Sequence, residues 1–384
     1  MKQKRILIVL IMVLVLSFTV LLTGCDALNI IKNESTNNEN TATNVTSKTE
    51  SVAVSYVSTD SKVYSSTAEV VKAVADTVVE ISTESVVTSW GRQYISSGAG
   101  SGVIIAVSNN TYYIITNNHV IEGVKNITVT TRDGITYEGT LFATDDSADI
   151  AVVSITSSEE LNVAVIGNSD DLQIGEDLIA IGNPLGSLGG TVTKGILSAT
   201  GRNIVIGDYQ MTLLQTDTAI NPGNSGGGLF NMKGELIGVV NAKTAEEEIE
   251  GICFAIPINI AKKVFNDLLE YGYILGRSTF NIEVAEGSIS SRVMSSQATT
   301  IVYVTSVNTN SSDNFKQYDM IYKINGVEIT SLLDYNIAMS KIAAGDTVEV
   351  EVYRGSISQS FWSSGISFAD EVTKFSTTAK QYGE

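Results

Sequence analysis

The sequence is poor in the residues that crosslink chains and bind metals. Its 384 residues include two cysteines, Cys25 and Cys253, and a single histidine, His119. Two cysteines cannot build a disulfide scaffold, so stability must come from core packing. A single histidine argues against a zinc hydrolase, which usually needs two or three histidine ligands. We therefore expect no metal site and no cofactor.

Basic residues are also scarce. There are 24 lysines and arginines against 42 acidic residues, which gives a formal net charge of -18. Such a surface repels phosphate backbones, so we expect no nucleic acid partner. Apolar residues make up 43% of the chain, enough to bury a core in each of two domains. Cys253 lies in the apolar run 251–256, GICFAI, which predicts a buried structural thiol.

The N-terminus has the pattern of a secretory signal. Three basic residues within the first five precede a largely apolar stretch over residues 6–22. Residues 22–25, LTGC, resemble a bacterial lipobox. That resemblance implies that residues 1–24 are a signal peptide, cleaved before a lipid-modified Cys25. The alternative is an uncleaved membrane anchor, because about 17 residues can just span a bilayer. Both interpretations place the rest of the chain outside the cytoplasm, attached to the bacterial cell membrane.

Composition divides the remainder into a tether and a first domain. Residues 25–66 are rich in Asn, Thr, Ser, Glu and Lys, which predicts a flexible polar tether. Residues 67–275 hold many short β-type runs between Gly, Asn and Asp, which predicts an all-β barrel or sandwich. A helix should close this domain, with Asn259 as its N-cap and Gly272 at its stop. The clearest β-type runs are residues 77–81, 111–116, 126–131, 150–155, 177–181 and 235–240.

A second, smaller domain is expected over residues 276–362. Ser331 and Asp334 fit a capping box at the start of a helix. In residues 347–353, valines alternate with glutamates, which predicts a strand with one buried and one wet face. The segment is therefore interpreted as a small α+β module, and residues 363–384 stay an unassigned tail.

Residues 221–227, NPGNSGG, carry the most specific chemical signal. A nucleophilic serine needs an exposed hydroxyl beside backbone N–H groups, and flanking glycines allow the tight backbone that this requires. We therefore expect Ser225 to be a nucleophile and the N–H groups of Gly223 and Ser225 to form an oxyanion hole. Such a donor typically contributes about 2.7–4 kcal/mol of transition-state stabilisation. A flexible loop without chemistry is the alternative interpretation of this motif alone.

A serine nucleophile needs a base that titrates near neutrality, and His119 is the one candidate in the sequence. The carboxylate that orients the imidazole should be buried. Asp149 begins the apolar run DIAVV, where an unpaired carboxylate would be costly, so we expect it to have a partner. Asp217 is its competitor, while Asp145 and Asp146 are predicted to be solvated turn residues.

The order His119, Asp149, Ser225 is that of the chymotrypsin-like proteases. Four phrases resemble the HtrA/DegP family: residues 116–120 (TNNHV), 180–186 (AIGNPLG), 216–227 (TDTAINPGNSGG) and 254–257 (FAIP). The resemblance implies a mostly β fold, with a chymotrypsin-like double β-barrel followed by a small α+β PDZ-like domain. It also implies a homotrimeric serine endopeptidase that degrades unfolded or misfolded proteins through a Ser-His-Asp acyl-enzyme mechanism.

Specificity is expected to depend on Ala219 and Ile220. Ala219 stands where trypsin-like pockets carry a carboxylate. Without a buried anion, nothing compensates a buried Lys or Arg side chain. We therefore expect cleavage after small aliphatic residues, as in the family.

The PDZ-like module departs from its family in two places. Such domains capture a peptide C-terminus with backbone N–H groups of a Gly-containing loop. The matching stretch is Phe280, Asn281 and Ile282, with Asn where Gly is usual, and Tyr318 likewise replaces a usual Gly. Asn tolerates positive φ better than other non-Gly residues. Binding of C-terminal peptides is therefore expected, with a structural or regulatory remnant as the alternative.

Two other functions compete. A non-catalytic chaperone-like or peptide-binding protein could keep the protease fold, but an altered set of His, Asp and Ser would have favoured it. A serine esterase needs Gly-x-Ser-x-Gly between a strand and a helix, with the serine first in chain order. Residues 223–227 satisfy that pattern, but the residues after Gly227 predict a strand and the chain order differs.

Overall fold

The computed structural model describes residue 54 and residues 62–89, 92–183, 190–221, 223–243, 251–289, 299–308, 314–360 and 363–382. The predicted signal peptide, the lipidation site Cys25 and most of the predicted tether lie outside the described residues. Within the described ranges, none of the helices combines the length and apolar character that crossing a membrane would require.

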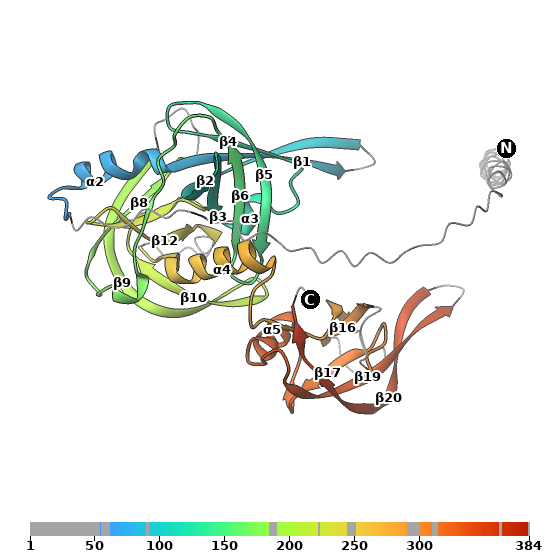
Figure 1. Ribbon diagram of the computed structural model, residues 1–384. Coiled ribbons are helices and arrows are strands. Elements are labelled where there is room, and N and C mark those ends of the chain that lie inside the picture. The colour runs from blue at the N-terminus through green and yellow to red at the C-terminus, as the bar shows by residue number, and fades with distance from the viewer. Residues whose placement is uncertain are drawn as a thin grey trace, which may run out of the picture. The chain divides into compact units, whose positions relative to one another are not determined.

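The first barrel is closed by strands in the order β1-β2-β3-β6-β5-β4 (Figure 1). Its interior is filled by Ile81, Ile114 and Val153, all of which are fully buried. β-branched residues fit this pleated, half-buried surface. The strands are β1 (Val78–Ser89), β2 (Arg92–Ser108), β3 (Thr111–Thr116), β4 (Asn126–Thr130), β5 (Thr136–Asp145) and β6 (Ile150–Thr156).

The second sheet has the order β11-β8-β9-β10-β13-β12-β7, and an additional pairing of β11 with β12 closes six of its strands into a ring. Leu178, Leu229 and Ile237 are fully buried inside it. The strands are β7 (Val165–Ile166), β8 (Asp177–Gly182), β9 (Thr191–Ile206), β10 (Tyr209–Thr216), β11 (Gly228–Asn231), β12 (Glu235–Asn241) and β13 (Cys253–Pro257).

The N-cap of the helix that follows β13 lies two residues before the predicted cap. The helix is α4 (Ile258–Tyr271), its N-cap is Pro257, and Asn259 lies inside the helix, where its N–H donates to the Ser169 hydroxyl. Gly272 ends the helix in the left-handed region at φ 77°, as predicted. The remaining helices of this part are α2 (Thr67–Val74), η1 (Ala75–Thr77), α3 (Asn118–Ile121) and η2 (Ser169–Asp171).

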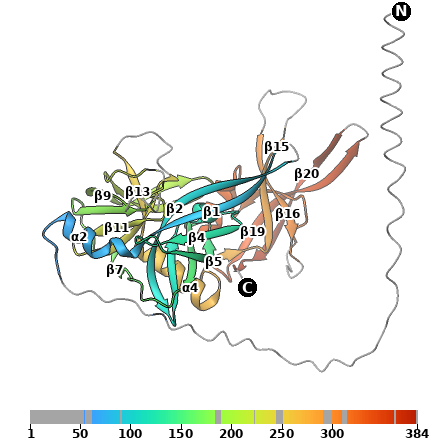
Figure 2. The same ribbon diagram turned by 90° about the horizontal axis from the view of Figure 1, so that it is seen from above.

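Two features extend this part of the chain beyond the barrels. The far halves of β1 and β2 form a two-stranded ribbon that leaves the first barrel (Figures 1 and 2). Tyr94 and Ile95 on this ribbon are exposed. Tyr64, within the stretch predicted to be a flexible tether, donates its N–H to the Met232 carbonyl at 2.9 Å. The end of that stretch therefore contacts the second barrel.

The C-terminal part is a sheet of order β15-β16-β17-β19-β20, with β18 paired to β17. Its core contains the fully buried Phe280, Val302 and Val350. The elements are β14 (Ser278–Thr279), β15 (Ile282–Ile289), β16 (Thr299–Val307), β17 (Met320–Ile324), β18 (Val327–Glu328), α5 (Leu332–Ser340), β19 (Thr347–Ser360), β20 (Ser363–Thr378) and β21 (Lys380–Gln381).

The tail that the sequence left unassigned is part of this second fold, because β20 pairs with β19 and β21 pairs with β14. The predicted cap is also present: the Ser331 hydroxyl accepts the Asp334 N–H. Asn281 and Tyr318, the two departures from glycine, have φ values of 55° and 72°. Both positions therefore use the left-handed backbone for which glycine is usual.

The predicted fold class is confirmed: the chain is mostly β, with a barrel-containing domain followed by a small α+β domain. Every β-type run named from the sequence for the first domain falls largely within a strand. The prediction for Cys253 was wrong in degree, because this residue begins β13 and is only partly buried.

Candidate active site

The fold brings His119, Asp149 and Ser225 together into one hydrogen-bonded chain. His119 Nδ1 lies 2.7 Å from Asp149 Oδ2, and His119 Nε2 lies 2.9 Å from Ser225 Oγ. His119 comes from α3, just after β3 of the first barrel. Asp149 comes from the turn before β6, and Ser225 from the turn before β11 of the second barrel. The three predicted catalytic residues therefore meet although long segments of sequence separate them.

Asp149 has an unusual backbone that the surrounding structure supports. Its φ is 50°, in a region that non-glycine residues rarely adopt. Its carbonyl accepts the side-chain amide of Asn117 at 3.0 Å and the N–H of Asn118 at 3.2 Å. Its own N–H donates to the Asp146 carbonyl at 3.1 Å. These bonds tie the carboxylate-bearing turn directly to the residues that precede His119.

The Asp149 carboxylate is fully engaged despite its burial. Oδ1 accepts the backbone N–H of His119 at 3.0 Å. Oδ2 accepts the Asn241 side-chain amide at 2.9 Å as well as bonding the imidazole. Such bonds fix the buried carboxylate in one orientation. Sequence reasoning missed Asn241, whose signal is a polar residue that ends the otherwise apolar run of β12.

Ser101, on β2 of the first barrel, forms two hydrogen bonds to the loop that carries Ser225. Its N–H donates to the Ser225 carbonyl at 2.8 Å, and its hydroxyl donates to the Gly223 carbonyl at 2.7 Å. Gly223 and Gly226 have φ values of 96° and 81°. A Cβ at Gly226 would collide with the Ser101 carbonyl oxygen, so this position requires glycine. Ser101 was also missed, because nothing in a Gly-Ser-Gly run marks a contact across the fold.

The predicted oxyanion donors are the backbone N–H groups of Gly223 and Ser225. Across the described residues, the N–H groups of Gly223 and Ser225 donate to no other protein group. Ser225 Oγ, in contrast, also accepts the Ala242 N–H at 3.1 Å. Backbone N–H groups that converge beside a serine hydroxyl can bind the oxygen of a carbonyl under attack.

Three other aspartates named from the sequence do not join this hydrogen-bonded chain. The competitor Asp217 is exposed, and its Oδ1 accepts the Ile196 N–H at 2.6 Å on the neighbouring strand. Asp145, predicted to be solvated, is buried because it forms an ion pair with Arg277. Asp146 accepts the Asn118 side-chain amide at 2.8 Å and is exposed, as predicted.

The two residues predicted to line the specificity pocket have different surroundings. Ala219 is exposed, and its carbonyl accepts the Thr193 hydroxyl at 2.8 Å. Ile220 is 7% exposed and packs with Leu178 and Leu197 inside the second barrel. Neither residue carries a charge that could hold a basic side chain.

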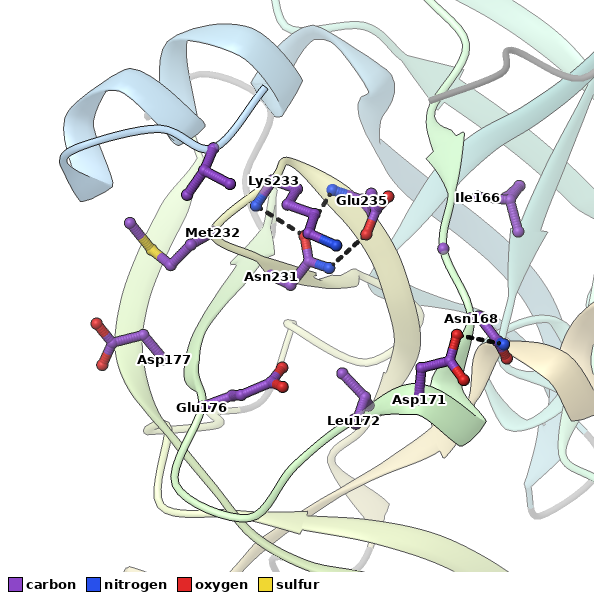
Figure 3. A pocket seen from close by; sticks show the side chains of 12 residues that line it. Ile166, Asn168, Asp171, Leu172, Glu176, Asp177, Asn231, Met232, Lys233 and Glu235 are labelled. Atoms are coloured by element: carbon purple, nitrogen blue, oxygen red, sulfur yellow. Dashed lines mark hydrogen bonds between the residues drawn. The ribbon is translucent and has the colours of Figure 1, made fainter. Parts of the chain in front are cut away.

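A cavity of about 500 Å³ in the first domain contains none of these residues (Figure 3). Its wall is largely acidic and polar, with Asp171, Glu176 and Asp177 on one side. The Asn231 amide donates to Glu235 at 2.6 Å and helps to close the other side. Its lining residues include neither a serine nor a histidine, so they do not offer the pair of residues found at Ser225. Its lining residues are Val63, Ile166, Gly167, Asn168, Asp171, Leu172, Glu176, Asp177, Asn231, Met232, Lys233 and Glu235.

A second cavity, of about 620 Å³, has an apolar wall from the C-terminal fold. Ile282 and Val284 of β15 line it together with Tyr335 and Met339 of α5. Phe280 of the predicted peptide-binding loop is fully buried in the core. The groups of this loop that remain available to a peptide are therefore its backbone and the Ile282 side chain, and not the Phe280 ring.

Both backbone groups of Asn281 are hydrogen-bonded within the protein. The Asn281 N–H donates to Thr279 Oγ1 at 3.0 Å, and its carbonyl accepts the Asn308 N–H at 3.1 Å.

As to metals, the described ranges contain no cluster of three or more His, Cys, Asp or Glu side chains arranged to hold an ion.

Comparisons with known proteins agree with this architecture. Residues 100–239 match the trypsin-like peptidase domain, and residues 285–362 match the PDZ domain. The chain is 39% identical over 276 residues to the serine protease Do-like HtrA of Bacillus subtilis (strain 168), covering 67% of this chain and 61% of that protein.

Another relative is the probable periplasmic serine endoprotease DegP-like of Buchnera aphidicola subsp. Schizaphis graminum. It is 36% identical over 264 residues, which cover 68% of this chain and 55% of the relative. The chain thus spans less than two thirds of the length of these relatives. Among solved structures, the HtrA-type protease AlgW with a decapeptide aligns at a TM-score of 0.53 and 28% identity, covering 83% of this chain and 99% of that one.

Proposed function

This chain belongs to the HtrA/DegP family of trypsin-like serine proteases, and from that premise we propose that it is a serine endopeptidase with Ser225 as nucleophile. One observation carries the proposal. The chain of hydrogen bonds from Asp149 through His119 to Ser225 is continuous, at 2.7 and 2.9 Å. An intact relay also weighs against a non-catalytic chaperone that merely keeps the fold.

The reaction is acyl transfer. His119 Nε2 takes the hydroxyl proton as Ser225 Oγ attacks the peptide carbonyl. The N–H groups of Gly223 and Ser225 bind the oxyanion, and Asp149 stabilises the imidazolium. His119 then gives the proton to the leaving amine, whose C–N bond breaks. Water repeats the sequence on the acyl-enzyme, which restores the Ser225 hydroxyl and releases the carboxylic acid.

Removal of the nucleophile tests this function directly. Ser225→Ala should abolish cleavage of unfolded casein and covalent labelling by a fluorophosphonate, and should leave the circular dichroism spectrum unchanged. Ser85→Ala is the matched control, because the Ser85 hydroxyl is on the exposed ribbon and donates only to the Ser96 carbonyl. Proteolysis that persists in Ser225→Ala at the parental rate would refute the assignment.

The substrates that we propose are unfolded or misfolded polypeptides, cleaved after small aliphatic residues. The support is chemical: Ala219 and Ile220 supply no anion to compensate a buried cation. Profiling with peptides that differ at one position should show Val or Ala preferred before the cleaved bond. A preference for Arg or Lys there would contradict this specificity.

We also propose that the protease works outside the cytoplasm, anchored by lipid on Cys25 and assembled as a homotrimer. Support comes from the basic and apolar N-terminus, from the LTGC phrase and from the family. A relative is named as periplasmic. Mass spectrometry of the mature N-terminus should find a diacylglyceryl group on Cys25, and an intact Met1 would exclude it. Sedimentation in mild detergent should give three chains per particle.

The PDZ-like fold is proposed to bind peptide C-termini. Within the described residues β15 pairs only with β16, so its other edge can accept a peptide strand. Ile282, Val284 and Met339 supply apolar side chains to the cavity that they line, which suit an apolar terminal residue. Calorimetry should detect a peptide that ends in Val or Leu, and amidation of its C-terminus should abolish binding. Equal heats for both peptides would favour a regulatory remnant.

A further inference from the structure

Asp145 is a buried carboxylate that the catalytic relay does not use. It ends β5, its side chain is fully buried, and it faces Ile150, the first residue of β6, across the hairpin. A buried carboxylate without a counter-charge is costly, so its partner matters. That partner is Arg277, whose Nη1 and Nη2 donate to Asp145 Oδ1 and Oδ2 at 2.5 and 2.7 Å.

Arg277 lies in the segment after α4, beyond the matched peptidase domain and before the matched PDZ domain. Its carbonyl accepts the Tyr382 N–H at 2.8 Å and the Gln381 side-chain amide at 3.1 Å. Burial alone would lower the pKa of Arg277, but the hydrogen bond and charge of Asp145, together with Tyr382 and Tyr209, outweigh burial and the pKa is raised. A planar guanidinium that meets both carboxylate oxygens fixes direction as well as charge.

Asp145 is also the first residue of the turn that ends in Asp149. Asp145 Oδ1 accepts both the N–H and the hydroxyl of Ser147, each at 3.1 Å. The Asp149 N–H then closes the turn onto the Asp146 carbonyl at 3.1 Å. One end of this short turn is therefore the ion pair. The other end, at a φ of 50°, bears the carboxylate that contacts His119.

We propose that Arg277 is a positioning residue for the proteolytic reaction: through Asp145 it holds the turn 146–149 so that the Asp149 carboxylate stays aimed at His119. Removing the guanidinium leaves Asp145 buried without its counter-charge, and the turn must move to expose it to water. Asp149 moves with the turn, and a shift of about 1 Å at a catalytic group can cost about a hundredfold in rate. This inference rests on the proposed function.

The test compares Arg277→Met with Arg277→Lys in the full chain. For Arg277→Met, kcat per serine titrated with a fluorophosphonate should fall about tenfold to a hundredfold while KM stays unchanged. Arg277→Lys should regain part of the rate, because lysine keeps the charge and loses the second bond. Asp145→Asn should reproduce the loss. Arg132→Met is the matched control, because Arg132 pairs with Asp76 on the exposed surface.

A spectroscopic readout separates positioning from mere stability. The chain has one histidine, so a downfield ring N–H proton in the NMR spectrum reports the His119 to Asp149 bond alone. It should shift or broaden in Arg277→Met and stay in place in Arg132→Met. If Arg277→Met fails to fold, the same resonance and kcat are measured in Arg277→Lys. A shifted resonance and a lower kcat there support the positioning role, and parental values of both overturn it.

The outcomes keep the two proposals distinct. Arg277→Met could melt at a lower temperature and still keep the parental kcat per titrated serine and the parental His119 resonance. That result would show that Arg277 only stabilises the fold, and it would overturn the positioning role. A parental chain that neither cleaves casein nor reacts with the fluorophosphonate would instead refute the proposed function itself.

Discussion

At the scale of single residues, Asn241 has a large predicted effect on catalysis. Its amide donates to the same Asp149 oxygen that bonds the imidazole. A hydrogen bond to a charged group is worth about 1.5–3 kcal/mol, so Asn241→Ala should lower kcat about tenfold to a hundredfold. Asn126→Ala is the control, because Asn126 bonds an exposed glutamate. Parental kcat in Asn241→Ala would show that Asp149 needs no third donor.

A substitution at Gly226 tests how closely the loop that carries Ser225 packs against the first barrel. Gly226→Ala combines a φ of 81° with a collision of the new Cβ against Ser101 and Thr116. Backbone strain and overpacking together should cost about 2–5 kcal/mol of unfolding free energy and remove activity. Gly134→Ala is the matched control, because φ is 86° there but nothing lies within 4 Å. It should cost about 1–2 kcal/mol by urea unfolding, from backbone strain alone. Equal costs would mean that contacts at Gly226 are unimportant.

The three residues of the relay could be predicted from sequence because each has a local signal. Ser225 lies in a glycine-rich phrase, His119 is a single histidine, and Asp149 opens an apolar run. The residues that position them have no such signal. Ser101 and Asn241 look like ordinary polar residues until the barrels bring them to Gly223 and Asp149.

At the scale of elements, the strands and turns followed from β-branched runs and from glycine, while the helix starts depended on local caps. Ser331 is the clearest cap, because its hydroxyl accepts the Asp334 N–H at 3.1 Å. The prediction of Asn259 as a cap was wrong because α4 begins at Ile258, directly after Pro257, whose non-helical backbone (φ -55°, ψ 137°) is that of an N-cap. Propensity alone could not separate these two candidates.

The cap of α5 gives a prediction at this scale. Ser331→Ala should lower the unfolding free energy of the C-terminal fold by about 1 kcal/mol. Ser340→Ala, at the last residue of the same helix, is the control. Hydrogen exchange of amides in α5 measures the loss. Casein cleavage should stay unchanged, because the cap lies outside the relay. Exchange rates equal to those of the control would show that the cap adds no stability.

At the scale of the whole molecule, the sequence could not predict contacts between distant segments. Asp145 was expected to be solvated because polar turn residues usually are, and its partner Arg277 follows 132 positions later. The tail was left unassigned because β20 and β21 are recognisable only from their partners β19 and β14. Both misses concern pairing across the fold, which local patterns do not encode.

Asp319 gives the molecule a predictable dependence on pH. Its side chain is fully buried in the C-terminal fold, Arg354 Nη1 lies 2.5 Å from its Oδ2, and its Oδ1 has no hydrogen-bond partner among the described residues. Burial raises the pKa of Asp319, and the bonds from Lys316 N–H and Arg354 only partly oppose this. The folded state therefore binds this proton more tightly than the unfolded state does.

The sign follows from that difference. The contribution of Asp319 to stability is complete below the unfolded aspartate pKa of about 3.9, and is lost as pH rises through the raised folded value. Asp319→Asn cannot titrate, so we expect the parent to lose stability relative to this variant over that window and to run parallel above it. Hydrogen exchange of residues 299–308 and 347–353 at a series of pH values measures the difference. A parent that gains stability relative to Asp319→Asn over the same window would mean that Arg354, rather than burial, dominates the carboxylate.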